Sequence, residues 1–100
     1  MAASSRRKGL RGEQEVARIL RESGSAVRGL EAKGDWLVMY ADNREWHVEV
    51  KRQERLKLPE WLRQAQDEAP AGVVPVVAFR QSRGQWYACL LLRDLVSAVS

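Results

Sequence analysis

Two short segments hold the residues with the clearest chemical potential, Gly34-Asp35 and Val48-Glu49-Val50-Lys51. The second segment alternates apolar and charged residues, as a β-strand does when its faces differ. Glu49 and Lys51 are therefore expected on one face, with Cα atoms roughly 6.5–7 Å apart. Asp35 begins the neighbouring strand of a predicted hairpin. Two carboxylates and a lysine grouped in this way can bind a hard cation and hold a positive charge beside it.

Hydrolysis of a phosphodiester is a reaction that uses these residue types. Mg²⁺ keeps several waters and takes only one or two carboxylates directly, so we expect Asp35, Glu49 and the backbone carbonyl of Val50 to bind it. The ion would polarise the phosphate and activate a water, while Lys51 would orient that water or stabilise the transition state. The alternative is a hairpin surface with one salt bridge, since Glu-x-Lys alone is a common pattern.

A third carboxylate, Glu13, has an unusual position on the helix predicted at 9–23. At 100° per residue, one side of this helix is an apolar stripe of Leu10, Val16, Ala17 and Leu20. The opposite, solvated side is made of Arg11, Gln14, Glu15, Arg18, Arg21 and Glu22. Glu13 falls within the apolar stripe, where an unpaired carboxylate is costly. Its partner is either an arginine or lysine, or a metal ion with its hydration shell.

The elements that position these residues follow from hydrophobic periodicity and from turn and helix-end signals. Helices are predicted at 9–23, 59–69 and 92–99. Strands are predicted at 26–30, 35–40, 45–51, 73–80 and 85–91. Gly24 is expected to end the first helix and Pro59 to begin the second. The order αβββαββα predicts an α/β fold, a single domain over 1–100 with a mixed five-stranded sheet flanked by helices.

The hairpin between the second and third strands carries a geometric requirement. A two-residue loop at 42–43 would put Asp35 opposite Val50, on the face away from Glu49. A three-residue loop would put Asp35 opposite Lys51 and on the same face as Glu49. The catalytic interpretation therefore predicts a loop of odd length, or a bulge near Asp35.

The charge distribution indicates a phosphate-binding partner. The net charge is +4. All charged residues before the first acidic residue are basic, and they form a basic arm at about 1–8 that extends to Arg11. The expected DNA contacts on this arm are Arg6, Arg7, Lys8 and Arg11. Further expected phosphate contacts flank the site in sequence: Lys33, Arg52, Arg55 and Lys57. The alternative for all of them is an ordinary solvated surface.

Several classes of protein are excluded by what the sequence lacks. No apolar run approaches membrane-spanning length, and no apolar segment follows the basic start as in a secretory signal. The single cysteine, Cys89, cannot form an internal disulfide. We therefore expect a cytoplasmic protein with no membrane partner and no small-molecule cofactor.

Two polar residues near the site have ordinary interpretations. His47 shares a face with Glu49, but a lone histidine is more often structural, and no ligand spacing indicates zinc. Gln64 is expected on the solvated surface of the second helix. The four tryptophans are expected in the core, with one or two of them available for a dimer interface.

The set Asp35…Glu49-Val50-Lys51 resembles the PD-(D/E)xK nuclease motif. The chain is more closely similar to the archaeal-type Holliday junction resolvases. That similarity follows the order of Lys8-Gly9, Glu13, Gly24-Ser-Ala-Val-Arg28, Gly34-Asp35, Val48-Glu-Val-Lys51, Val74-Pro-Val-Val-Ala-Phe-Arg80 and Gly84-Gln-Trp86. The segment 52–68 departs from the family's pattern.

The resemblance implies a restriction-endonuclease-like fold and a homodimer that cuts four-way DNA junctions with paired incisions. It implies Mg²⁺ as the cofactor, with Mn²⁺ able to substitute. The catalytic roles carry over to Glu13, Asp35, Glu49 and Lys51, with both glutamates and the aspartate as metal ligands. Two alternatives stay open: a nuclease of the same fold that acts on other DNA structures, and an inactive DNA-binding module.

Overall fold

The computed structural model describes the backbone of residues 2–29, 36–41 and 44–99, and the side chains of 11–28 and 44–98. Its elements are α1 (Ala2–Glu22), β1 (Ala26–Gly29), β2 (Trp36–Ala41), β3 (Arg44–Arg52), α2 (Leu58–Glu68), β4 (Val74–Arg80), β5 (Tyr87–Cys89) and α3 (Leu92–Val99). The predicted α/β class and the order αβββαββα are confirmed. Within the described residues, no helix is both long enough and apolar enough to cross a membrane.

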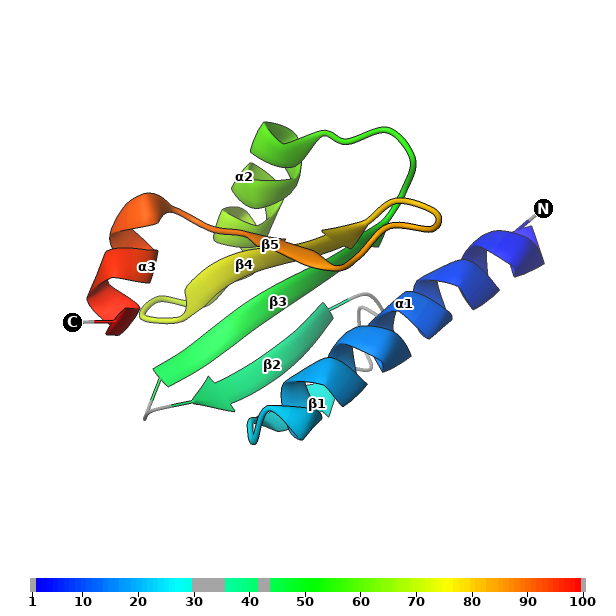
Figure 1. Ribbon diagram of the computed structural model, residues 1–100. Helices are drawn as coiled ribbons and strands as arrows, with labels where there is room; N and C mark the ends of the chain where they lie inside the picture. The colour runs from blue at the N-terminus through cyan, green and yellow to red at the C-terminus, as the bar shows by residue number, and fades with distance from the viewer. Residues whose placement is uncertain (1, 30–35, 42–43, 100) are drawn as a thin grey trace.

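The sheet is mixed, with strands hydrogen-bonded in the order β1-β2-β3-β4-β5 (Figure 1). The pairs β1–β2, β2–β3 and β4–β5 are antiparallel. The pair β3–β4 is parallel, and α2 lies in the connection between those two strands, as parallel neighbours require. β3 therefore lies in the middle of the sheet, and its residues 47–50 are all buried.

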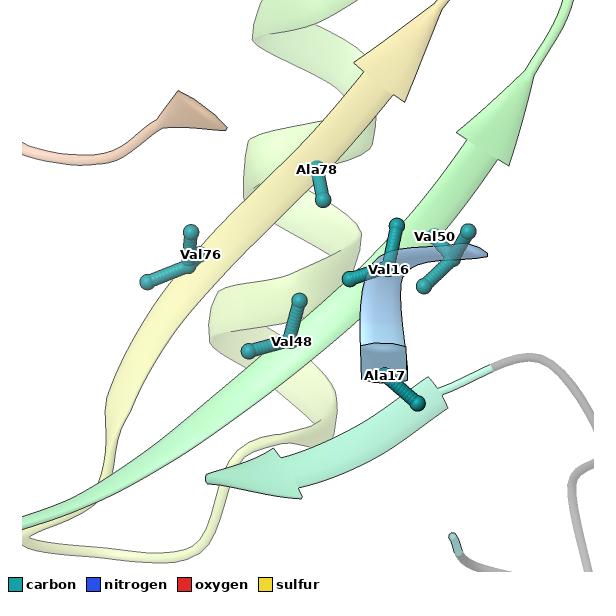
Figure 2. Packing of buried hydrophobic residues seen from close by; sticks show 6 residues of the cluster. All are labelled: Val16, Ala17, Val48, Val50, Val76 and Ala78. Atoms are coloured by element: carbon teal, nitrogen blue, oxygen red, sulfur yellow. The ribbon is translucent and has the colours of Figure 1, made fainter. Parts of the chain in front are cut away.

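Two hydrophobic clusters cover the two faces of the sheet. On one face, Val16 and Ala17 of α1 pack on a patch made of Val48, Val50, Val76 and Ala78 (Figure 2). On the other face, Trp61 and Ala65 of α2 pack on Val77. Because β3 is covered on both sides, every side chain in its centre is removed from water.

The C-terminal end of α1 is the one that the sequence predicts. Gly24 has a φ of 90°, a conformation that glycine adopts without steric cost. Its N–H donates to the carbonyl of Arg21, and the N–H of Ser25 donates to that of Leu20, both at 3.0 Å. These two bonds satisfy carbonyls that the helix end would otherwise leave unpaired.

The N-terminal start of α1 differs from the prediction. The helix begins at Ala2 and not near residue 9, so residues 2–8 form its first turns instead of a separate basic arm. Alanine, arginine and lysine all favour helix, and Gly9 is accommodated within it. The arm's basic residues therefore belong to the helix.

The hairpin register also differs from the prediction. Ala41 pairs with Arg44 and Trp36 pairs with Glu49, which is the register of a two-residue loop at 42–43. The predicted loop of odd length is wrong, because the chain uses the shortest common hairpin connection. The other form of that prediction, a bulge near Asp35, lies outside the described residues.

Candidate functional site

Glu49 is a fully buried carboxylate in the middle of β3. Its Oε1 atom lies 3.7 Å from Nζ of Lys51, whose side chain is 15% exposed. Val48 and Val50 point to the opposite face, into the cluster under α1 (Figure 2). The predicted division of this strand, with Glu49 and Lys51 on one face and the valines on the other, is confirmed.

The face that carries Glu49 is the one covered by α2. In the parallel register Glu49 pairs with Val77, and Val77 is the residue on which Trp61 and Ala65 pack. The buried carboxylate therefore lies beside the second helix and not beneath the first.

His47 and Glu68 join Glu49 on this face. His47 is completely buried, and its Nε2 atom lies 3.7 Å from Glu49 Oε2 and 3.9 Å from Glu68 Oε2. One potential ligand atom from each of the three residues lies within 4.8 Å of the others. Among the described residues, this is a cluster of side chains that could bind a metal ion.

Glu68 is a site residue that the sequence analysis missed. It lies at the C-terminal end of α2, and its side chain is 26% exposed. A signal was present, because Glu68 follows the buried residues Trp61 and Ala65 at helical spacing and so continues their stripe. The same reasoning that singled out Glu13 on the first helix applies to Glu68 on the second.

Gln64 is exposed, as predicted, but it also has a definite contact. Its Nε2 atom donates a hydrogen bond of 3.2 Å to Glu68 Oε1. This bond holds one oxygen of Glu68, while the other oxygen faces His47. Gln64 therefore orients a carboxylate of the cluster from the outer surface of the helix.

The local electrostatics of the cluster are negative. Glu49 and Glu68 bring two carboxylates together, and Glu68 lies at the C-terminal end of a helix whose last turn has no basic residue. That end carries partial negative charge from the backbone carbonyls. Lys51 is the adjacent cation on β3. The remaining negative charge of the two carboxylates would be balanced by a positively charged His47 or by a bound cation.

Glu13 is partly buried, as its place in the apolar stripe predicts. It lies on α1, which packs on the Val48–Val50 face, whereas Glu49 and Lys51 lie on the α2 face. The neighbouring Gly12 closely approaches β3, since a Cβ added there would lie 3.5 Å from Val50 Cγ1. The structure thus places Glu13 beside β3, but across the sheet from Glu49.

Asp35 and Lys33 lie outside the described residues. The last described pair of β2 with β3 is Trp36–Glu49, and β3 continues beyond it through Val50 to Arg52. The backbone of Val50 therefore lies just beyond the last described pair of this hairpin. A site that combines Asp35, Glu49 and the Val50 carbonyl has to lie at this end of the hairpin.

The predicted DNA contacts differ in exposure. Arg11, Arg55 and Lys57 are exposed, and Arg52 is half-buried. Arg6, Arg7 and Lys8 lie on the first turns of α1, where side chains are not among those described. Arg55 and Lys57 follow β3 directly, in the connection that leads from the Glu49–Lys51 strand to α2.

Glu15 is predicted on the solvated side of α1, but the structure shows it partly buried. Its Oε2 atom accepts hydrogen bonds from Arg80 Nη1 at 2.8 Å and Trp86 Nε1 at 2.9 Å. Burial raises the pKa of Glu15, but the hydrogen bonds from Trp86 and Arg80 and the charges of Arg80 and Arg52 outweigh it, so the pKa is lowered. Glu15 therefore acts as an anionic contact between α1 and two residues beyond it in the fold, Arg80 at the end of β4 and Trp86 in the connection to β5.

A comparison with protein-family models finds no match, and a search of curated proteins finds none either.

Proposed function

We propose that the protein is a metal-dependent DNA endonuclease, and within that class a structure-selective enzyme that resolves four-way junctions. The observation that carries the proposal is the fully buried Glu49 with Lys51 at 3.7 Å on the central strand. A desolvated carboxylate is costly unless a positive group compensates it. The same pair is the Glu-x-Lys part of the nuclease motif.

The residues present suit a hard cation. Glu49 and the Val50 carbonyl supply oxygen ligands. The observed register, continued regularly, would put Asp35 opposite Val50, so Asp35 would complete the set for Mg²⁺ or Mn²⁺ only through a bulge near it. When bound, such an ion polarises the scissile phosphate and lowers the pKa of a coordinated water. Glu13 lies across the sheet from Glu49, so it could take part only through the outer hydration shell of an ion held at the end of the hairpin, beside the Val50 carbonyl.

Lys51 has the role of a fixed charge in this proposal. It is held near Glu49 by the strand itself, because alternate residues share a face. A side chain positioned in advance stabilises developing negative charge without reorganisation. Lys51 would therefore stabilise charge on the phosphate as the water attacks.

The proposed DNA path crosses three of the exposed cations that the sequence predicts as phosphate contacts. Arg55 and Lys57 lie on the surface immediately after β3, and Arg11 lies on the exposed side of α1. Such contacts position the phosphate backbone without reading its sequence. They also make affinity depend steeply on salt, because binding releases counterions.

A homodimer is part of the proposal, since one chain with one such site needs a second copy to make paired incisions. An apolar surface suitable for that copy is present on α3, where Leu92, Leu95 and Val96 are 73%, 44% and 55% exposed. In Figure 1, α3 lies at one end of the sheet, away from α1. Light scattering should give a dimer mass for the wild type and a lower mass for Leu95→Gln.

The decisive experiment incubates the full chain with four-way junction, flap and linear duplex DNA, with Mg²⁺ or with a chelator. We expect Mg²⁺-dependent cutting of the junction, and its loss in Glu49→Gln. Glu60→Gln is the matched control, because it makes the same change at an exposed position. Equal cutting of the three DNAs would replace junction resolution by a broader nuclease activity. DNA binding without cutting of any substrate would favour the inactive binding module.

A further inference from the structure

We propose that His47, Glu49 and Glu68 form a second cation site that takes a transition-metal ion such as Zn²⁺. This site shares Glu49 with the proposed catalytic site but differs from it in its ligands. Its existence does not depend on nuclease activity, because it follows from the contacts on the α2 face.

The spacing of the three ligand atoms fits one ion. His47 Nε2 is 3.7 Å from Glu49 Oε2 and 3.9 Å from Glu68 Oε2. Both distances exceed those of a direct hydrogen bond. Bonds of about 2.0–2.1 Å to a tetrahedral Zn²⁺ put its ligand atoms about 3.3 Å apart. All three ligand atoms lie within 4.8 Å of one another, so shifts of less than about 1 Å in each side chain would bring them onto one ion.

Each carboxylate already divides its two oxygens between two partners. In Glu49, Oε1 faces Lys51 and Oε2 faces His47. In Glu68, Oε1 accepts the hydrogen bond from Gln64 and Oε2 faces His47. The two Oε2 atoms thus converge on the imidazole, while Lys51 and Gln64 hold the other oxygens in place. Outer partners of this kind orient metal ligands.

The charge of the cluster favours a cation. Two carboxylates meet at the negative end of α2, and the last turn of that helix offers no basic residue. Lys51 supplies one positive charge, at Glu49 Oε1. An ion bound at the Oε2 atoms would neutralise the second carboxylate without displacing Lys51.

The donor set selects the type of ion. An imidazole nitrogen suits Zn²⁺, Ni²⁺ and Cu²⁺, whereas Mg²⁺ prefers oxygen ligands and retains its waters. Glu68 is 26% exposed, whereas His47 and Glu49 are fully buried. An ion can therefore enter past Glu68 and keep one water on that side, which gives three protein ligands and an open fourth position.

The test measures metal binding by the full chain without DNA. Zn²⁺ is titrated by calorimetry, and Co²⁺ serves as a spectroscopic probe, since its visible absorption reports nitrogen and oxygen ligation. We expect one Zn²⁺ per chain at this site, retained in a large excess of Mg²⁺. Glu68→Gln should weaken Zn²⁺ binding at least about tenfold, and His47→Gln should weaken it further and remove the Co²⁺ absorption.

Glu60→Gln is the control, since it makes the same change on an exposed face of the same helix. Circular dichroism checks that each variant is folded. If the variant of the buried His47 fails to fold, Glu68→Gln still tests the proposal, because the Glu68 side chain is partly exposed. Absence of Zn²⁺ binding by the wild type, or equal binding by wild type and Glu68→Gln, would overturn the proposal. Loss of nuclease activity alone would not bear on it.

Discussion

The side chains of Glu49 and Lys51 lie on one face of β3, with Oε1 and Nζ 3.7 Å apart, and the carboxylate is completely buried. This relationship lets the effect of each residue be tested separately.

Lys51→Met should lower the rate of single-turnover junction cleavage at saturating Mg²⁺ by about 100-fold or more. Loss of one preorganised positive or hydrogen-bonding group has an effect of this size in other active sites. Junction affinity should change little, because the exposed cations supply most phosphate contacts. Gel-shift titration and rapid-quench cleavage measure the two quantities. A large loss of affinity with an unchanged cleavage rate would assign Lys51 to DNA binding instead.

The Glu15 contact predicts a pH-dependent stability. The pKa of Glu15 is lowered below its ordinary value of 4.5, so the folded state favours the charged carboxylate. The stabilisation is therefore present above that ordinary value and is lost as the pH falls through the lowered folded-state pKa. Glu15→Gln should cost about 1–2 kcal/mol in the free energy of unfolding at pH 7.

Urea unfolding of wild type and Glu15→Gln at pH 7 and at about pH 3 tests this expectation. The difference between the two proteins should shrink at the lower pH, where the wild-type carboxyl is increasingly protonated. A difference that stays constant would mean that Glu15 contributes through packing and not through its charge.

Gly12→Ala should stabilise the protein. Gly12 lies within α1, where alanine is favoured over glycine by up to about 1 kcal/mol. An added Cβ would lie 3.4 Å from Trp86 Cη2 and 3.5 Å from Val50 Cγ1, which is ordinary van der Waals contact. Thermal unfolding should show a higher Tm for Gly12→Ala and a lower Tm for Gly12→Leu, whose larger side chain cannot fit between α1 and β3.

The second cation site predicts inhibition of the proposed nuclease by Zn²⁺. An ion held by His47, Glu49 and Glu68 would compete for the Glu49 carboxylate that the catalytic Mg²⁺ needs. Micromolar Zn²⁺ should therefore reduce Mg²⁺-dependent cleavage by the wild type. The inhibition of Glu68→Gln is measured against that variant's own rate without zinc. The zinc concentration that halves this rate should be about tenfold higher, or more, than for the wild type. Equal inhibition of both proteins would place the inhibitory zinc elsewhere.

Local sequence patterns were sufficient to predict much of this arrangement. The alternation around Glu49 fixes which side chains share a face, because the strand period is a local property. Gly24 marked the end of α1 for the same reason, since a left-handed residue at a helix end depends only on its immediate neighbours.

Contacts between distant segments could not be read in this way. A helical projection puts Glu15 on the solvated side because it omits Arg80 at the end of β4 and Trp86 in the connection to β5. Glu68 meets His47 only because the connection between two parallel strands folds α2 over β3. The hairpin register depended on a loop length that the composition of the turn did not decide.

The parallel pairing of β3 with β4 has a consequence for the folding pathway. β1, β2 and β3 form a meander of antiparallel neighbours. Their contacts join residues that are near in sequence, so they form early in folding. His47 and Glu49 belong to that meander, but they are covered by α2 and flanked by β4, which require the larger crossover to close. We therefore expect the amides of β2 to gain protection from hydrogen exchange before those of β4, with His47 and Glu49 hydrated until the crossover is complete.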